Sequence, residues 1–134
     1  YVNVGIRFST DLNPKELIKF TSGLENKYGR RRKRRWESRS CDIDILLCDQ
    51  QILPSRDYFV KWLKLNFSDQ IKLVPDELII PHPRLQERTF FLKPLNDLQP
   101  DWIHPFLKLK AKEMLDSLPL NEIHNIKELN AKNR

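Results

Sequence analysis

The sequence predicts one α+β domain in which helices pack against an antiparallel sheet. Apolar and polar residues alternate with the period of a strand from Val2 to Ser9 and from Cys41 to Cys48, and a short strand is expected from Leu78 to Ile80. With 134 residues and 40% hydrophobic content, the chain can build a single core. We expect this domain to span residues 1 to 118, with a frayed tail or linker over residues 119 to 134.

Helix signals separate the predicted strands. Asn13 is a typical N-cap, Pro14 suits the first helical position and Glu16 completes a capping box, so a helix should begin there and end at Gly29. Its apolar stripe is expected to pack on the sheet and consists of Leu17, Phe20, Leu24 and Tyr28. Further helices are expected around residues 58 to 65, from Arg84 to Lys93, where Pro94 should end or kink the helix, and from Pro105 to Leu118.

The net charge of the chain is concentrated in one run. Between Arg30 and Arg39, seven Lys or Arg residues and one Glu give a local charge of +6, which equals the formal net charge of the whole chain. Repulsion among the arginines disfavours a regular helix, so we expect a loop that binding of an anion would order. No apolar stretch is long enough to predict a membrane span, and we expect a cytoplasmic protein.

Two aspartates follow the basic run on the next predicted strand. Asp42 and Asp44 should share one side of that strand, about 7 Å apart. Mg²⁺ in nucleotide sites prefers one or two carboxylates together with phosphate oxygens, while arginines neutralise phosphate charge. Taken alone, a basic run is more typical of a solvated face or a nucleic-acid patch, and an isolated Asp-x-Asp pair more often binds no metal.

A histidine lies in the stiff segment Ile-Pro-His-Pro-Arg, residues 80 to 84. The prolines disfavour helical backbone before them, so the imidazole of His82 should be presented from an extended loop. His104 and His124 form no evident cluster with it. The sequence has no glycine-rich phosphate loop, nucleophile elbow or HExxH motif.

Taken together and in order, these motifs resemble those of the 6-hydroxymethyl-7,8-dihydropterin pyrophosphokinase family. The resemblance runs from residue 1 to about residue 102 and leaves residues 49 to 76 unmatched. It rests on Tyr1-Val2-Asn3, Glu25, Gly29-Arg30-x-Arg32, Arg35-Trp36-x-x-Arg39, Asp42-Ile43-Asp44, Ile80-Pro81-His82-Pro83-Arg84, Glu87-Arg88 and Phe90. It implies a ferredoxin-like sandwich and transfer of pyrophosphate from ATP to a pterin alcohol in folate biosynthesis.

The resemblance also implies a role for each matched residue. Asp42 and Asp44 would hold two Mg²⁺ ions and, with Arg30 and Arg39, form the catalytic set. The residues implied in nucleotide binding are Arg32, Arg35, Trp36, His82 and Arg88. Those implied in binding the pterin are Tyr1 and Phe90, on either side of the ring, and Asn3 at its edge.

Two other functions and two partners complete the expectation. An RNA-binding or polyanion-binding module could use Arg30 to Arg35, and a catalytically inactive remnant could keep the fold alone. The resemblance itself implies no nucleic acid and no membrane.

The chain begins at Tyr1 without an initiator Met, and in the family a strand, a helix and a loop precede this point. We therefore expect a missing N-terminal segment or another chain to pair with residues 2 to 9. Fusion to another folate-pathway enzyme is also expected.

Overall fold

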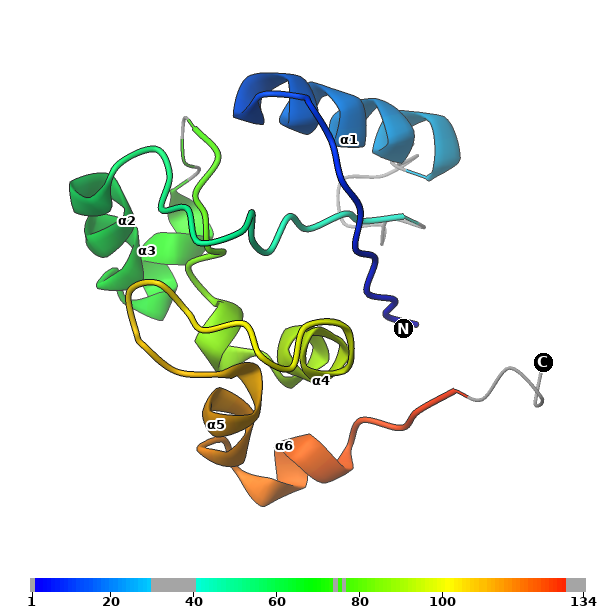
Figure 1. The fold of residues 1–134 in the computed structure, drawn as a ribbon, viewed down its shortest axis with the longest axis vertical. Helices are drawn as coiled ribbons and strands as arrows, with labels where there is room; N and C mark the ends of the chain where they lie inside the picture. Colours follow the sequence, from blue (N-terminus) through cyan, green and yellow to red (C-terminus); the bar gives the residue numbers. More distant parts are fainter. Residues whose placement is uncertain (1, 30–40, 74, 76, 130–134) are drawn as a thin grey trace.

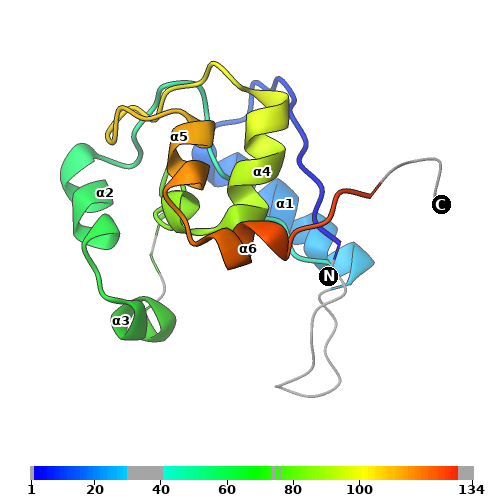
Figure 2. The same ribbon diagram turned by 90° about the horizontal axis from the view of Figure 1, so that it is seen from below.

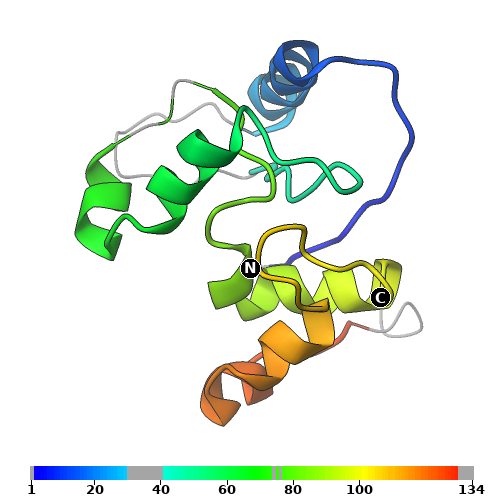
Figure 3. The same ribbon diagram turned by 60° about the vertical axis from the view of Figure 1, so that its left-hand side comes forward.

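The computed structural model describes residues 2 to 29, 41 to 73, 75 and 77 to 129. Their helices, in chain order, are α1 (Pro14–Tyr28), α2 (Arg56–Leu63), α3 (Phe67–Lys72), the 3-10 turn η1 (Leu85–Glu87), α4 (Thr89–Leu98), α5 (Ala111–Asp116) and α6 (Leu120–His124). Figures 1 and 3 show α1 at one end of the molecule and α4 with α5 at the other, with the extended chain of residues 41 to 53 between them. In Figure 2, α2 and α3 stand to one side of the α4–α5 pair.

Local signals set the two ends of α1, and both predicted ends are confirmed. The side-chain oxygen of Asn13 accepts a hydrogen bond from the backbone N–H of Glu16 at 2.9 Å, and Pro14 occupies the first turn. At the other end, the N–H of Gly29 donates to the carbonyl oxygen of Glu25 at 3.0 Å. These contacts need only neighbouring residues, which is why the sequence predicts them.

The buried face of α1 differs from the predicted stripe. Leu17, Thr21 and Glu25 are buried, whereas Phe20 and Tyr28 expose 53% and 63% of their surface. The predicted stripe assumed a flat sheet beneath the helix. Among the described residues no sheet lies beneath α1. The side chains that α1 buries are therefore more polar than those of the predicted stripe.

The predicted antiparallel sheet, and with it the ferredoxin-like sandwich, is wrong for the part of the chain that the structure describes, because these residues form no strand longer than an isolated bridge. From Val2 to Ser9 the chain has no regular structure, and its side chains are exposed although its backbone approaches α4 at Gly5. The apolar side chains of Val2, Val4, Ile6 and Phe8 expose between 60% and 76% of their surface. Alternation decides which side of a strand would be apolar, but a strand exists only when a neighbour pairs with its backbone.

The segments around the other two predicted strands, residues 41 to 48 and 78 to 80, form no ladder and meet at two points, each of which involves one residue outside the predicted strands. Leu53 and Ile80 exchange backbone hydrogen bonds of 2.8 and 3.1 Å as an isolated antiparallel bridge. Farther along, the N–H of His82 donates to the carbonyl oxygen of Leu46 at 2.8 Å. These contacts hold the chain that carries Asp44 beside the loop that carries His82.

Two clusters of apolar side chains form the core. One lies between η1, α4 and α5, and the other joins α2 to the chain before Ile80. The buried members of the first are Leu85, Phe91, Leu92, Leu95, Trp102, Ala111, Met114 and Leu115; those of the second are Phe59, Trp62 and Ile79. The predicted helix around residues 58 to 65 is confirmed as α2, whose amphipathic face supplies two of these residues.

A buried histidine joins the two clusters and shortens a predicted helix. The imidazole of His104 lies 5.9 Å from the ring of Phe59 and 5.6 Å from that of Trp102, between centroids. Its Nδ1 atom accepts the backbone N–H groups of Phe106 and Leu107 at 3.1 and 3.0 Å. Because these N–H groups are held by a side chain, residues 105 to 110 form a loop, and the predicted helix from 105 to 118 reduces to α5.

The helix predicted after His82 is shifted along the chain. The structure has the short turn η1 and then α4, which continues past Pro94 to Leu98, so the prediction that the helix ends at Lys93 is wrong. A proline lacks only one helical hydrogen bond, and burial of Phe91, Leu92 and Leu95 outweighs that loss. In the predicted tail, α6 has no buried residue. Among the described helices, none has the length and apolar content needed to cross a bilayer.

Candidate functional site

A cleft of about 570 Å³ brings together five parts of the described chain. Its walls come from the buried face of α1, the extended chain around Asp44, the α2–α3 hairpin (residues 56 to 72), the described residues from 73 to 79, and the segment from His82 to Arg88. A smaller cavity of about 370 Å³ lies at the start of α1, between Asn13 and Leu53, and none of the predicted site residues lines it. The larger cleft is therefore the candidate site.

The imidazole of His82 is fixed in the cleft in its neutral form. Its Nδ1 atom accepts the backbone N–H of Arg84 at 3.1 Å, and its ring meets Phe91 edge to face, 5.0 Å between centroids. Burial first, and then the charges of Arg88 and Arg84, lower the pKa of His82 from 6.5 to about 4. Since Nδ1 is an acceptor, the proton of the neutral ring is on Nε2, which can donate to a ligand.

Two arginines line the cleft beside this histidine. The guanidinium of Arg88 lies 5.7 Å from the ring centroid of Phe90 and 5.2 Å from that of Phe91. The guanidinium of Arg84 forms an ion pair with Glu87 and lies over the ring of Phe67. A guanidinium held near aromatic rings by cation–π contacts keeps N–H groups that can bind an anion.

The two predicted metal ligands keep the alternation that the sequence predicts. Asp42 and Asp44 are exposed, while Ile43 and Ile45 between and after them are half-buried. Oδ1 of Asp44 lies 4.0 Å from Nε2 of His82, at the cleft wall. The described residues contain no cluster of three or more carboxylate, histidine or cysteine side chains that could hold a metal by themselves. Mg²⁺ does not require one, because with nucleotides it is bound by one or two carboxylates and by phosphate oxygens. This pair fits such an ion.

The other predicted site residues lie either outside the described residues or outside the cleft. Tyr1, Arg30, Arg32, Arg35, Trp36 and Arg39 lie outside the described residues. Asn3 is exposed on the N-terminal segment, and Phe90 on α4 is 38% exposed, with its ring 4.7 Å from that of Phe91. Asn3 and Phe90 do not line the cleft.

Their two segments nevertheless meet. A Cβ atom added at Gly5 would lie 2.8 Å from Cδ1 of Leu98 and 3.0 Å from Cβ of Pro94, so the N-terminal chain packs directly on α4. A side chain at this position would require Leu98 and Pro94 to shift, so the close approach favours glycine. Asn3 is two residues before this contact and Phe90 is one helical turn before Pro94.

Arg84 and Gln70 are among the residues of the cleft wall that sequence reasoning missed. Arg84 is part of the Ile-Pro-His-Pro-Arg motif, and its position beside His82 was a signal that could have identified it. Gln70, on α3, also lines the cleft, and the side-chain amide donates hydrogen bonds to two backbone carbonyls. Nothing in the sequence around Gln70 marks it, because its partners lie elsewhere in the chain.

A protein-family model matches most of the chain. The model described as 7,8-dihydro-6-hydroxymethylpterin-pyrophosphokinase (HPPK) matches residues 1 to 100 of this chain. The matched range includes every side chain of the cleft named above.

Curated proteins with similar sequences carry related names. The folic acid synthesis protein FOL1 of Dictyostelium discoideum is 35% identical over 127 residues, which are 94% of this chain and 16% of that protein. The 2-amino-4-hydroxy-6-hydroxymethyldihydropteridine pyrophosphokinase of Bacillus subtilis is 34% identical over 98 residues, 73% of this chain and 47% of that enzyme. The protein of the same name from Aquifex aeolicus is 31% identical over 113 residues, 84% of this chain and 58% of that enzyme. The matches thus span less than two thirds of each relative.

Proposed function

Because the chain belongs to the 7,8-dihydro-6-hydroxymethylpterin-pyrophosphokinase family, we propose that it transfers pyrophosphate from ATP to 6-hydroxymethyl-7,8-dihydropterin. The products are AMP and the pterin diphosphate. One observation carries the proposal beyond the family match: Asp44, from one segment of the chain, and His82 and Arg88, from another, line the same cleft. A carboxylate for a metal and two donors for phosphate are the groups that this transfer needs.

Asp42 and Asp44 are the proposed ligands of two Mg²⁺ ions. Bound there, Mg²⁺ would neutralise phosphate charge and polarise the phosphorus–oxygen bonds of ATP. The chain's own part is to hold the carboxylate of Asp44 at the cleft and the exposed Asp42 two residues before it on the same extended segment. The neutral state of His82 supports this, because a protonated imidazole 4.0 Å from Asp44 would compete with the cation.

His82 and Arg88 are the proposed phosphate contacts on the described wall. The Nε2–H group of His82 donates one hydrogen bond to a phosphate oxygen, and the guanidinium of Arg88 adds charge and two or more donors. From the basic run, Arg30 and Arg39 are proposed to neutralise the phosphoryl group as it transfers. Arg32, Arg35 and Trp36 are proposed to close over the nucleotide.

The proposed pterin site lies where the N-terminal segment meets α4. Tyr1 and Phe90 would take the ring between them, and Asn3 would hydrogen-bond to its edge. Support comes from the close packing of Gly5 on α4 near Pro94, which brings the two segments to one place. Aromatic rings on both faces suit a flat heterocycle.

Three wider features belong to the same proposal. A β neighbour from outside the described residues, supplied by an N-terminal segment or by another chain, is proposed to pair with residues 2 to 9. Fusion to another folate-pathway enzyme is supported by the Dictyostelium relative, which is named as a folic acid synthesis protein and is far longer than the matched region. The proposed location is the cytoplasm.

Product analysis tests the proposed reaction. The full-length protein is incubated with ATP, Mg²⁺ and 6-hydroxymethyl-7,8-dihydropterin, and nucleotide products are separated by chromatography. AMP in equal amount to the pterin diphosphate is expected, because attack falls on the β-phosphorus. Formation of ADP would refute pyrophosphate transfer. Binding of Mg-ATP without either product would favour an inactive remnant, and salt-sensitive binding of unrelated oligonucleotides would favour an RNA-binding module.

A further inference from the structure

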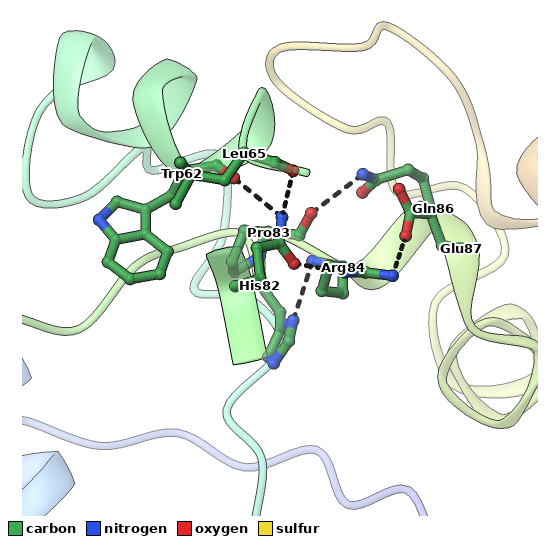
Figure 4. Close-up of polar contacts among 8 residues, drawn as sticks. Trp62, Leu65, His82, Pro83, Arg84, Gln86 and Glu87 are labelled. Carbon is green, nitrogen blue, oxygen red and sulfur yellow. Dashed lines mark hydrogen bonds and ion pairs between the residues drawn. The ribbon is translucent and has the colours of Figure 1, made fainter. Parts of the chain in front are cut away.

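The guanidinium of Arg84 is held from three sides in the cleft wall. Its Nη1 atom donates to Oε1 of Gln70 at 2.5 Å, and Nη2 forms an ion pair of 2.5 Å with Oε2 of Glu87. The guanidinium carbon lies 5.1 Å from the ring centroid of Phe67. Figure 4 shows Arg84 beside Glu87, near the turn that carries Trp62 and Leu65. The side chain of Arg84 keeps 16% of its surface exposed, so the group is nearly covered yet still reaches the cleft.

The amide of Gln70 is itself fixed by the α2–α3 hairpin. Its Nε2 atom donates to the carbonyl oxygens of Trp62 and Leu65, each at 3.1 Å. Both amide hydrogens are then used, and this leaves Oε1 as the acceptor that faces Arg84. The hairpin therefore presents one oriented acceptor to a residue fourteen positions farther along the chain.

Arg84 retains hydrogen-bonding capacity after these contacts. An arginine side chain has five N–H groups, and the contacts above use one on each terminal nitrogen. The Nε atom is buried and has no hydrogen-bond partner among the described residues. A fixed guanidinium with unused donors, beside His82 and a second arginine, is suited to bind phosphate.

We propose that Gln70 is a positioning residue, which holds the guanidinium of Arg84 in the cleft wall so that its unused N–H groups bind the phosphates of the nucleotide. The α2–α3 hairpin thereby becomes part of the nucleotide site. This inference rests on the proposed function, and it adds Gln70 and Arg84 to the site residues that the sequence predicts. The competing explanation is that Gln70 only caps the end of α2.

Three variants of the full-length protein separate these explanations. Gln70→Leu removes the amide at nearly constant volume, and Phe67→Leu removes the ring beneath the guanidinium. Phe67 is 62% exposed, so its replacement should leave the fold intact even if Gln70→Leu is destabilising. Gln51→Leu, at an exposed position outside the cleft, is the matched control. The dissociation constant of Mg-ATP is measured by calorimetry on folded protein, together with the melting temperature.

We expect Gln70→Leu to weaken Mg-ATP binding about tenfold, the effect of losing one hydrogen bond to a charged group. Phe67→Leu should weaken it about threefold, as for loss of a partly exposed cation–π contact. Gln51→Leu should change nothing. In an Arg84→Ala background, Gln70→Leu should have no further effect on affinity, because Gln70 acts through Arg84.

Three other outcomes would overturn the inference and point to different errors. If wild-type protein binds Mg-ATP but Gln70→Leu lowers only the melting temperature, Gln70 is a structural cap and the proposed function stands. If wild-type protein does not bind Mg-ATP, the proposed function fails and the inference fails with it. Equal loss of affinity from Gln70→Leu with and without Arg84 would show that Gln70 does not act through Arg84.

Discussion

Nε2 of His82 lies 4.0 Å from Oδ1 of Asp44, although the two residues come from separate segments of the chain. The backbone hydrogen bond from His82 to Leu46 holds these segments together. The neutral imidazole leaves Nε2–H as a donor for an anion, beside a carboxylate of the kind that binds a cation. A complex of a metal ion with a phosphate presents both a cation and an anion.

Replacing Asp44 by Ala should separate activity from stability. The carboxylate is 37% exposed, so its loss should shift the melting temperature by no more than a few degrees. Turnover should fall roughly 100-fold or more, because a group that stabilises charge in the transition state is lost with the metal. Asp97→Ala, an exposed carboxylate on α4, is the control. An Asp44→Ala protein that unfolds, yet retains activity per folded molecule, would contradict the metal assignment.

The stability of the protein should fall as the pH is lowered from about 6.5 to about 4. Burial lowers the pKa of both His82 and His104 to about 4, so in this range the unfolded chain binds more protons than the folded protein. Each histidine should reduce the free energy of unfolding by up to about 1.4 kcal/mol per pH unit. Urea unfolding at pH 7, 6 and 5 measures this slope. His82→Asn should make the slope shallower, and an unchanged slope would show that His82 is not a neutral, buried group.

Replacing Arg88 by Lys should weaken Mg-ATP binding by about tenfold at constant net charge. Lysine keeps the charge but loses the planar fork and its stacking on Phe90 and Phe91. Arg56→Lys provides a matched control, because the guanidinium of Arg56 lies over the ring of Phe106, 4.8 Å from its centroid, and does not line the cleft. Equal losses of Mg-ATP affinity from Arg88→Lys and Arg56→Lys would point to a general effect of replacing an arginine on stability.

The N-terminal segment should gain a β neighbour in the protein as it occurs naturally. Four large apolar side chains between residues 2 and 8 are exposed, and an open apolar edge favours pairing. Amide hydrogen exchange over residues 2 to 9 should be slowed by at least about tenfold in the natural full-length gene product, or in this chain as its concentration rises. Fast exchange under every condition would leave these residues without a strand partner and would refute the proposal.

Local chemistry explains which parts of the fold could be predicted. The cap at Asn13, the proline at position 14 and Gly29 act on their own neighbours, so both ends of α1 follow from the sequence. The sheet could not be predicted by the same means, since alternation in residues 2 to 9 says nothing about whether a pairing partner is present. The prediction of a helix over residues 105 to 118 failed because Nδ1 of His104 accepts hydrogen bonds from the N–H groups of Phe106 and Leu107, which would lie in the first turn of that helix.

The candidate site also contains residues that motifs predict and residues that only the folded chain brings together. Asp44, His82 and Arg88 were predicted from motifs, and the structure places all three along one cleft. The motif approach could not find Gln70, whose role depends on a contact with Arg84 that only the folded chain creates.

The rings of Phe59, His104 and Trp102 make the α2–α3 hairpin inseparable from the rest of the molecule. Phe59 contacts His104 on one side and Phe106 on another, at 5.6 Å between centroids, while Ile79 packs in the same cluster. Deleting residues 56 to 72 would therefore expose the apolar surface that Phe59 covers and would remove a ring that packs against the imidazole of His104. A minimal version of this protein cannot be made by trimming that hairpin as if it were a dispensable loop.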